Sequence, residues 1–192
     1  MRINNLYFVA SLLVFSLIST AGCVYTREED WPAGLPHGDI ILPNVEDPDT
    51  PGAYFDFSTG SILYGDQGRQ EGDIYLDYTF VTGNAALNVA LASTQTDTIL
   101  YDTTAPSWGQ GWNEPQSETS PAREPVRQHM NYWVRTAEGH YGKLRIVDKE
   151  SNADVTSYNF IKFQWVYQPD GSNELHAIEG ASEAGTDEST GS

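Results

Sequence analysis

The sequence predicts a mostly β fold, a single antiparallel β domain with little helix. Apolar and polar residues alternate with a period of two, as expected for strands that bury one face. Turn sequences containing glycine or proline separate these stretches. The alternation is clearest in residues 73–80, DIYLDYTF, where one face collects Ile74, Leu76, Tyr78 and Phe80.

The other elements follow in chain order. A hairpin is predicted at residues 54–57 and 62–64, around the turn Ser58-Thr59-Gly60. Beyond strand 73–80, further strands are predicted at 86–91, 98–101, 131–136, 141–147 and 158–167, with turns at Glu138-Gly139 and Pro169-Asp170-Gly171. One short helix is predicted at about 121–130, because Ser120 and Pro121 suit its cap and first turn.

The chain begins with the layout of a secretory signal peptide. Residues 6–18, LYFVASLLVFSLI, are apolar apart from two serines, and they lie between the single charge of Arg2 and the small residues 19–22. This run of 13 residues is shorter than the ~20 that a membrane-spanning helix needs. We therefore interpret residues 1–22 as a signal peptide that is removed on export.

Cys23 is the only cysteine in the 192 residues. Together with Thr20, Ala21 and Gly22 it resembles the lipobox of bacterial lipoproteins, in which the cysteine sulfur receives a diacylglycerol and becomes the first residue after cleavage. Two or three acyl chains hold a protein on a membrane far more durably than one. The prediction is an exported protein that is lipid-anchored to the outer membrane through Cys23. The alternative is an unmodified thiol in a small-residue cleavage region.

Composition divides the mature chain into three parts. Residues 23–52 contain REED at 27–30 and five prolines without a sustained apolar period, so we expect an extended tether from the lipidated cysteine. Residues 53–178 form the expected β domain. Residues 179–192, EGASEAGTDESTGS, have no large apolar residue and are expected to be a disordered acidic tail.

The net charge excludes one class of partner. It is −17 for the full chain and −18 after removal of residues 1–22, because Arg2 is the only charged residue among them. Nucleic acids and anionic lipids bind through Lys and Arg, so a surface this acidic repels them. We therefore expect no nucleic-acid function.

Several segments resemble the HmuY-like family of bacterial lipoproteins. The likeness is carried by residues 132–146, YWVRTAEGHYGKLRI, and by 163–172, FQWVYQPDGS. Residues 54–60, YFDFSTG, resemble the opening strand of that family. Residues 76–80, LDYTF, lie where the family has a Trp-Asp-x-Ala-Phe segment; they match it at Asp77 and Phe80 and differ from it at Leu76 and Thr79. The resemblance covers roughly 53–178 and is weakest in 81–128.

This resemblance implies a mostly β, membrane-anchored lipoprotein. The best-known members of the family bind haem and pass it to an outer-membrane transporter, so haem and such a transporter are the expected cofactor and partner. The acidic stretch 27–30 resembles the signal that sends lipoproteins to the cell surface in Bacteroidota, although a solvated acidic linker would look the same.

Axial haem ligation requires two of His, Met, Cys or Tyr on opposite faces of the porphyrin. His129 is the best single candidate ligand for the iron, with Met130 or Tyr132 as weaker neighbours. His140 cannot share an iron with His129, because a hairpin around 138–139 separates the two by about 26 Å of strand. His140 is expected to be exposed after its turn, His37 to lie in the tether and His176 to lie near the tail.

The long loop 103–122 offers a second candidate site. Trp108 and Trp112, separated by Gly109-Gln110-Gly111, could present indole faces to a sugar ring or a porphyrin, with Gln110, Asn113 and Glu114 as hydrogen-bonding neighbours. The alternative is that the tryptophans form a small satellite core at the edge of the domain. In the first case the protein is a glycan- or protein-binding surface module.

Enzymatic motifs are not found in the sequence. It contains no Gly-x-Ser-x-Gly elbow, His-Glu-x-x-His or phosphate-binding glycine loop, and its only cysteine is assigned to lipidation. Acidic residues are numerous, but strand alternation places Asp73 and Asp77 on the expected solvent side. We predict a binding protein rather than an enzyme.

Replacing Cys23 by serine is expected to abolish acyl labelling and to leave uncleaved precursor, because the diacylglycerol is attached to the sulfur before cleavage. Labelling with radioactive palmitate measures the acylation, and detergent phase partition measures the membrane anchoring. Unchanged labelling and membrane partition in the variant would refute the anchor.

Overall fold

The computed structural model describes residues 34–46, 52–94, 100, 103–153 and 156–176. The predicted signal peptide at 1–22, Cys23 and the predicted tail at 179–192 lie outside these residues. No helix among the described residues is long and apolar enough to cross a membrane.

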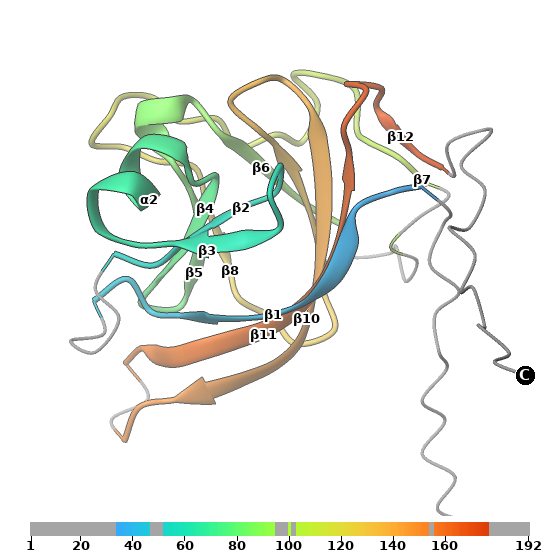
Figure 1. The fold of residues 1–192 in the computed structure, drawn as a ribbon. Helices are drawn as coiled ribbons and strands as arrows, with labels where there is room; N and C mark the ends of the chain where they lie inside the picture. Colours follow the sequence, from blue (N-terminus) through green and yellow to red (C-terminus); the bar gives the residue numbers. More distant parts are fainter. Residues whose placement is uncertain (1–33, 47–51, 95–99, 101–102, 154–155, 177–192) are drawn as a thin grey trace, which may run out of the picture. The chain divides into compact units, whose positions relative to one another are not determined.

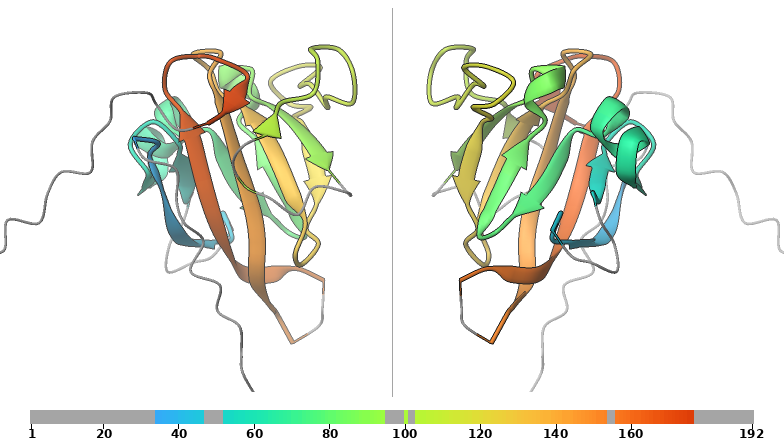
Figure 2. Two further views of the ribbon diagram at one scale, coloured as in Figure 1. Left: turned by 90° about the vertical axis from the view of Figure 1, so that its right-hand side faces the viewer. Right: turned by 90° about the vertical axis from the view of Figure 1, so that its left-hand side faces the viewer.

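Two five-stranded antiparallel sheets make up the domain, which confirms the predicted fold class. Sheet A has the order β1 (His37–Pro43), β11 (Tyr158–Gln168), β10 (Tyr141–Ser151), β9 (Asn131–Arg135) and β6 (Ala90–Thr94). Its two longest strands, β10 and β11, lie side by side in Figure 1 and extend past the other strands at one end in Figure 2. The predicted strands at 131–136, 141–147 and 158–167 are confirmed by β9, β10 and β11.

Sheet B has the order β3 (Ser61–Leu63), β2 (Tyr54–Asp56), β4 (Ile74–Asp77), β5 (Phe80–Gly83) and β8 (Arg123–Pro125). The predicted hairpin at 54–64 is confirmed by the pairing of β2 with β3. A third, two-stranded sheet pairs β12 (Glu174–Leu175) with β7 (Thr103–Thr104).

The main core lies between the inner faces of sheets A and B. Phe55 of β2 meets Phe163 and Trp165 of β11, with ring centroids 5.3 and 5.2 Å apart. Gly142 of β10 allows sheet B to come this close, because a Cβ atom there would lie 2.5 Å from the ring of Phe57. Burial of such aromatic side chains is the main stabilising contribution to the fold.

A second apolar cluster covers the outer face of sheet A. Its centre is Trp133 of β9 and Val166 of β11, both buried, and the segments that cover them contribute Leu35, Leu100, Ala105 and Leu175. Trp112 and Tyr141 pack at its margin. Sheet A is therefore buried on both faces at this end.

The prediction of an extended tether over 23–52 is wrong for residues 37–43. These form β1, which pairs with β11 over seven residues, from His37 opposite Val166 to Pro43 opposite Phe160. Leu42 is fully buried in the main core. Pro43, one of the prolines that suggested a tether, is compatible with β1 because it is the last residue of an edge strand.

The predicted helix at 121–130 is also wrong. Residues 123–125 form β8, which pairs with β5, and the N–H of Val126 donates to the carbonyl of Thr79 at 2.8 Å. Pro125 would stand inside such a helix, where it has no N–H to donate and its ring clashes with the preceding turn. The helix that does form, α2 (Gly65–Glu71), has the sequence GDQGRQE and therefore no apolar stripe that could have revealed it.

Two other predicted strands differ in extent. The stretch 73–80 is broken by a two-residue turn, because Asp77 pairs with Phe80 and Tyr78 has φ 52°. The stretch 86–91 begins in the 3₁₀ helix η1 (Ala85–Leu87) before β6 starts at Ala90. Most of the stretch 98–101 lies outside the described residues.

Leu42→Ala is expected to lower the free energy of unfolding by about 2–5 kcal/mol, because it leaves a cavity in the main core. The neighbouring Ile41, 55% exposed on the same strand, provides the control: Ile41→Ala should cost less than about 1 kcal/mol. Urea denaturation of the mature chain, residues 23–192, measures both. Equal effects of the two substitutions would show that β1 is not part of the folded core.

Candidate functional site

The loop that carries the two tryptophans is anchored to sheet A. The backbone of Asn113 bridges to Leu91 near the start of β6, with N–H to carbonyl distances of 2.7 and 3.0 Å in the two directions. The indole Nε1 of Trp112 donates to the carbonyl of Pro106 at 3.0 Å. These contacts attach the loop to β6, an edge strand of sheet A, and hold the indole of Trp112 within the loop.

Trp112 and Trp108 have different environments. Trp112 is half-buried, and its ring lies 6.0 Å from that of Tyr141 and 5.7 Å from that of Trp108. Trp108 is 48% exposed, and the guanidinium of Arg135 lies over its ring at 4.4 Å. Trp112 therefore joins the satellite core that the sequence offered as an alternative, whereas Trp108 presents an indole at the surface.

We call Trp108, Trp112, Arg135 and Tyr141 the aromatic face. Arg135 and Tyr141 pair across β9 and β10, and this places their side chains on the same side of sheet A. Neither was among the candidate residues identified from the sequence. The predicted hairpin around 138–139 could have suggested them. In that hairpin the numbers of two paired residues sum to about 277, and in the structure Tyr141 pairs with Arg135, a sum of 276.

The polar neighbours predicted for the tryptophans divide into two kinds. Gln110 and Glu114 are exposed, and they are close in sequence to Trp108 and Trp112. The side chain of Asn113 already has a partner within the protein, because its Nδ2 donates to the carbonyl of Arg123 at 2.6 Å. Only Gln110 and Glu114 therefore have side chains available to a ligand.

The three candidate haem ligands do not form a two-sided iron site. His129 is exposed on a turn with φ 64°, fixed by its N–H to the carbonyl of Ile146 at 2.7 Å. Met130 packs against the main core. Tyr132 is fully buried, and its hydroxyl donates to the carbonyl of Pro125 at 2.6 Å and accepts the N–H of Arg127 at 2.9 Å.

The burial of Tyr132 also opposes the ionisation that binding to iron requires. It raises the pKa of the Tyr132 hydroxyl to about 12. His129 precedes β9, whereas Arg135 is the last residue of β9, so about 13 Å of strand lies between the two candidate sites. The sequence-predicted site residues thus fall into two separate places.

Two of the other three histidines, His140 and His37, are placed differently from their predictions. His140 was expected to be exposed, but it is half-buried, and its Nδ1 lies 2.7 Å from the hydroxyl of Tyr167. His37 belongs to β1 rather than to a tether. His176 is exposed after β12, and its Nδ1 lies 3.9 Å from the carboxylate of Glu174.

Asp73, which alternation placed on the solvent side, is buried. Its Oδ2 accepts the N–H of Phe57 at 2.9 Å. Burial raises the pKa of Asp73 to about 7, and the nearby charges of Asp56 and Glu138 act in the same direction. The prediction failed because β4 begins only at Ile74, so Asp73 lies before the strand and does not follow its alternation.

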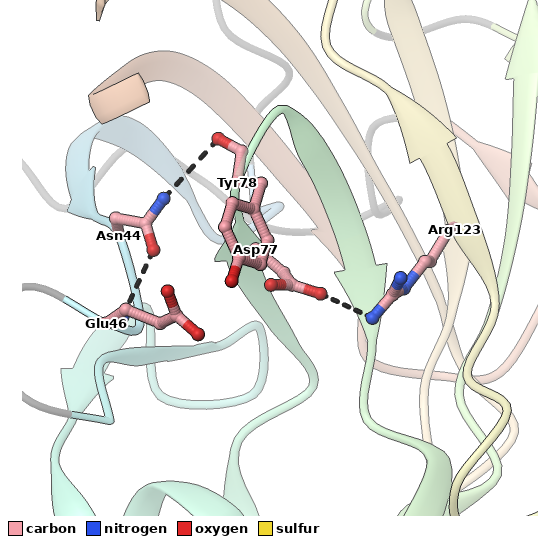
Figure 3. Close-up of polar contacts among 5 residues, drawn as sticks. All are labelled: Asn44, Glu46, Asp77, Tyr78 and Arg123. Carbon is pink, nitrogen blue, oxygen red and sulfur yellow. Dashed lines mark hydrogen bonds and ion pairs between the residues drawn. The ribbon is translucent and has the colours of Figure 1, made fainter. Parts of the chain in front are cut away.

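Asp77 is buried as well, because it is paired. Figure 3 shows its carboxylate pointing at the guanidinium of Arg123, with which it forms an ion pair. In the same view Asn44 joins the turn after β4, where its Nδ2 lies 3.4 Å from the carbonyl of Tyr78, and its Oδ1 accepts the N–H of Glu46 at 3.1 Å. These polar groups stabilise the junction of β1 with sheet B.

No metal site is evident in the described part of the chain, where no group of three or more His, Cys, Asp or Glu side chains could hold an ion. The aromatic face brings an exposed tryptophan, a second tryptophan, a tyrosine and an arginine into contact. Its chemistry is that of a binding surface: a half-exposed indole, a guanidinium stacked on it, and two further rings behind.

Comparison with known proteins returns similar structures only. No family model and no curated protein matches the chain. Similar solved structures include the apo HmuY analogue of Tannerella forsythia (11% identity, TM-score 0.47), a candidate HmuY-like haem-binding protein of Bacteroides vulgatus (15%, 0.38) and a candidate lipoprotein of Bacteroides fragilis (12%, 0.39). The alignments cover 72%, 72% and 74% of this chain and 98% of each of the other chains. These structures are of the kind that the sequence resembles, but at these TM-scores the likeness carries no conclusion about a ligand.

The raised pKa of Asp73 predicts a pH-dependent stability. The unfolded chain loses this proton near pH 4 and the folded chain near pH 7, so the folded state binds more protons between these values. The contribution of Asp73 therefore lowers the free energy of unfolding as pH rises from about 4 to about 7, by an amount on the order of a few kcal/mol. Asp73→Asn should remove this contribution and make the protein more stable than wild type at pH 8.

Urea denaturation at pH 5 and pH 8 tests this. Asp66→Asn is the matched control, because it makes the same charge change on a side chain that is 89% exposed. Identical pH dependence in the two variants would contradict the assignment to Asp73.

Proposed function

We propose that this chain is an exported, lipid-anchored binding protein that holds a glycan on the aromatic face. The observation that carries the proposal is the half-exposed ring of Trp108, fixed in place by Trp112 and Arg135. A half-exposed indole backed by a second tryptophan and an arginine offers a flat apolar surface on which the ring of a ligand can stack.

The order of the aromatic face supports binding. Trp112 is held by its hydrogen bond to Pro106, and Arg135 and Tyr141 are carried by paired strands. A ligand that docks there does not have to immobilise these side chains, which lowers the entropic cost of association. Tryptophan, tyrosine and arginine are also the residues that contribute most to binding energy at interfaces.

A sugar ring suits this surface. Its apolar face can cover the exposed indole, while its hydroxyls need polar partners at the rim. The exposed side chains of Gln110 and Glu114 are available in the same loop for that role. A long loop held on a rigid sheet is also a common location for a binding site.

Haem bound at His129 is the second candidate. It is supported by the sequence resemblance of residues 132–146 and 163–172 to haem-binding lipoproteins, and by the exposure of His129 on a turn held by Ile146. Met130 and Tyr132 do not supply the opposite axial ligand. In this case the partner would be an outer-membrane transporter that receives the haem.

The location of the protein is proposed from the sequence. The signal peptide at 1–22 and the lipobox-like segment ending at Cys23 support anchoring to the bacterial outer membrane, and the acidic stretch 27–30 supports display on the cell surface. A surface-displayed domain would meet polysaccharides directly. This agrees with a glycan ligand and with the absence of enzymatic motifs in the sequence.

Trp108→Ala is expected to weaken retention of the mature chain on immobilised polysaccharide by about tenfold, because it removes the stacking face. Tyr64→Ala is the matched control, since Tyr64 is 50% exposed away from the aromatic face and its loss should change nothing. Affinity electrophoresis across a panel of polysaccharides measures both variants. Binding that Trp108→Ala leaves intact would contradict the proposed site.

Haemin titration of the same proteins separates the two candidates. A saturable one-to-one Soret change that His129→Ala abolishes and Trp108→Ala leaves intact would favour haem, because loss of an axial imidazole alters the iron spin state. Non-specific haemin association in all variants would favour the glycan.

A further inference from the structure

Among the described residues, Arg135 is one of three basic residues that lie over an aromatic ring: Lys143 lies over Trp133 and Lys149 over Tyr158, whereas Arg135 lies over the half-exposed Trp108. Arg69 is paired with Asp66, and Arg123 with Asp77. Within the described ranges no carboxylate forms an ion pair with Arg135, whose guanidinium instead lies over the exposed ring of Trp108. A chain with 27 acidic and 10 basic residues thus keeps one arginine on an exposed aromatic ring and away from its own carboxylates.

The guanidinium carbon of Arg135 lies 4.4 Å from the centroid of the Trp108 ring, and a flat contact at this distance leaves the hydrogen-bonding capacity of the arginine available. A guanidinium that lies on a ring uses its flat face for the contact, while its N–H groups point outward in its own plane. On the other side it approaches the turn at Gly139, where a Cβ atom would lie 3.3 Å from Nη2 of Arg135. Gly139 has φ 82°, which glycine adopts without strain, so the turn leaves room for the arginine.

The surroundings of Arg135 strengthen an interaction with an anion. Tyr141 lies opposite Arg135 on β10. The ring of Trp112 contacts the rings of both Tyr141 and Trp108. Aromatic neighbours exclude part of the solvent, and this makes a charge-assisted hydrogen bond stronger than it is in water. A carboxylate is the anion whose planar geometry matches the guanidinium fork.

From this arrangement we infer that the glycan of the aromatic face is acidic: a uronic-acid polysaccharide whose sugar ring covers Trp108 and whose carboxylate is bound by Arg135. This inference rests on the proposed function and names its ligand class. A carboxylate attached to a sugar ring lies at the edge of that ring, which is where the N–H groups of a guanidinium stacked beside the indole would meet it.

The net charge of the protein opposes any general attraction of an acidic glycan. At −17, the molecule as a whole repels a polyanion. Retention on an acidic polymer therefore cannot come from general attraction and has to come from a local site. A neutral polymer would lack the ion pair and bind only through the stacking contact.

The test uses polygalacturonate and the same polymer after its carboxyl groups have been reduced to alcohols. Arg135→Gln in the mature chain should weaken binding to polygalacturonate by about ten- to a hundredfold, the range of one charge-assisted hydrogen bond. Arg135→Lys, which keeps the charge and loses the fork, should be affected less. Arg127→Gln is the matched control, an exposed arginine that precedes β9 whereas Arg135 ends it, and should bind as wild type.

The expected result is tight binding of wild type to polygalacturonate, weak binding to the reduced polymer, and no difference between wild type and Arg135→Gln on the reduced polymer. Trp108-dependent binding that is equal on both polymers and insensitive to Arg135→Gln overturns this inference alone. If binding to neither polymer depends on Trp108, the proposed function is overturned as well. One-to-one haemin binding that Arg135→Gln weakens, without retention on either polymer, assigns the arginine to a porphyrin carboxylate instead.

Discussion

The eleven-residue strands β10 and β11 pair along nearly their whole length, and the rest of sheet A is added to this pair. On one side β1 joins β11, and on the other β9 joins β10 and carries β6. Because strand pairing fixes which residues lie opposite each other, the same register decides which side chains share a face. Arg135, Tyr141 and Gln168 form one such row across three strands. The aromatic face exists because this register holds.

The two faces of sheet A are both covered, but by different material. The inner face meets sheet B through large aromatic rings, with Phe55 against Phe163 and Trp165. The outer face is covered by loops and by the short β7–β12 sheet, whose apolar residues make the second cluster. A layer made of loops can leave one ring partly uncovered without disturbing the core between the sheets. Trp108 is such a ring, which is why a binding surface can be built there at little cost to the fold.

The few basic residues of this acidic chain contact carboxylates, hydroxyls or aromatic rings. Arg123 neutralises the buried Asp77, and Lys149 donates to the hydroxyl of Tyr158 at 2.6 Å. Burial raises the pKa of Asp73 to about 7, and the nearby charges of Asp56 and Glu138 add to this effect. Arg135, like Lys149 over Tyr158, lies over an aromatic ring, and its ring, that of Trp108, is half-exposed. Carboxylates that are paired or protonated can be buried, while an arginine without a carboxylate partner is available to a ligand.

The sequence by itself determined the period-two strands, the turns between them and the hairpin that brings β9 and β10 together, because alternation and turn residues are local properties. It also singled out Trp108 and Trp112 within an unusually long loop. Tertiary structure alone decided that residues 37–43 form an edge strand, since their pairing partner, β11, lies more than a hundred residues later in the chain. It likewise decided that 123–125 form a strand, that Asp73 and Asp77 are buried, and that Arg135 rests on Trp108. Each of these depends on contacts between segments distant in sequence, and such contacts leave no periodic signal in either segment.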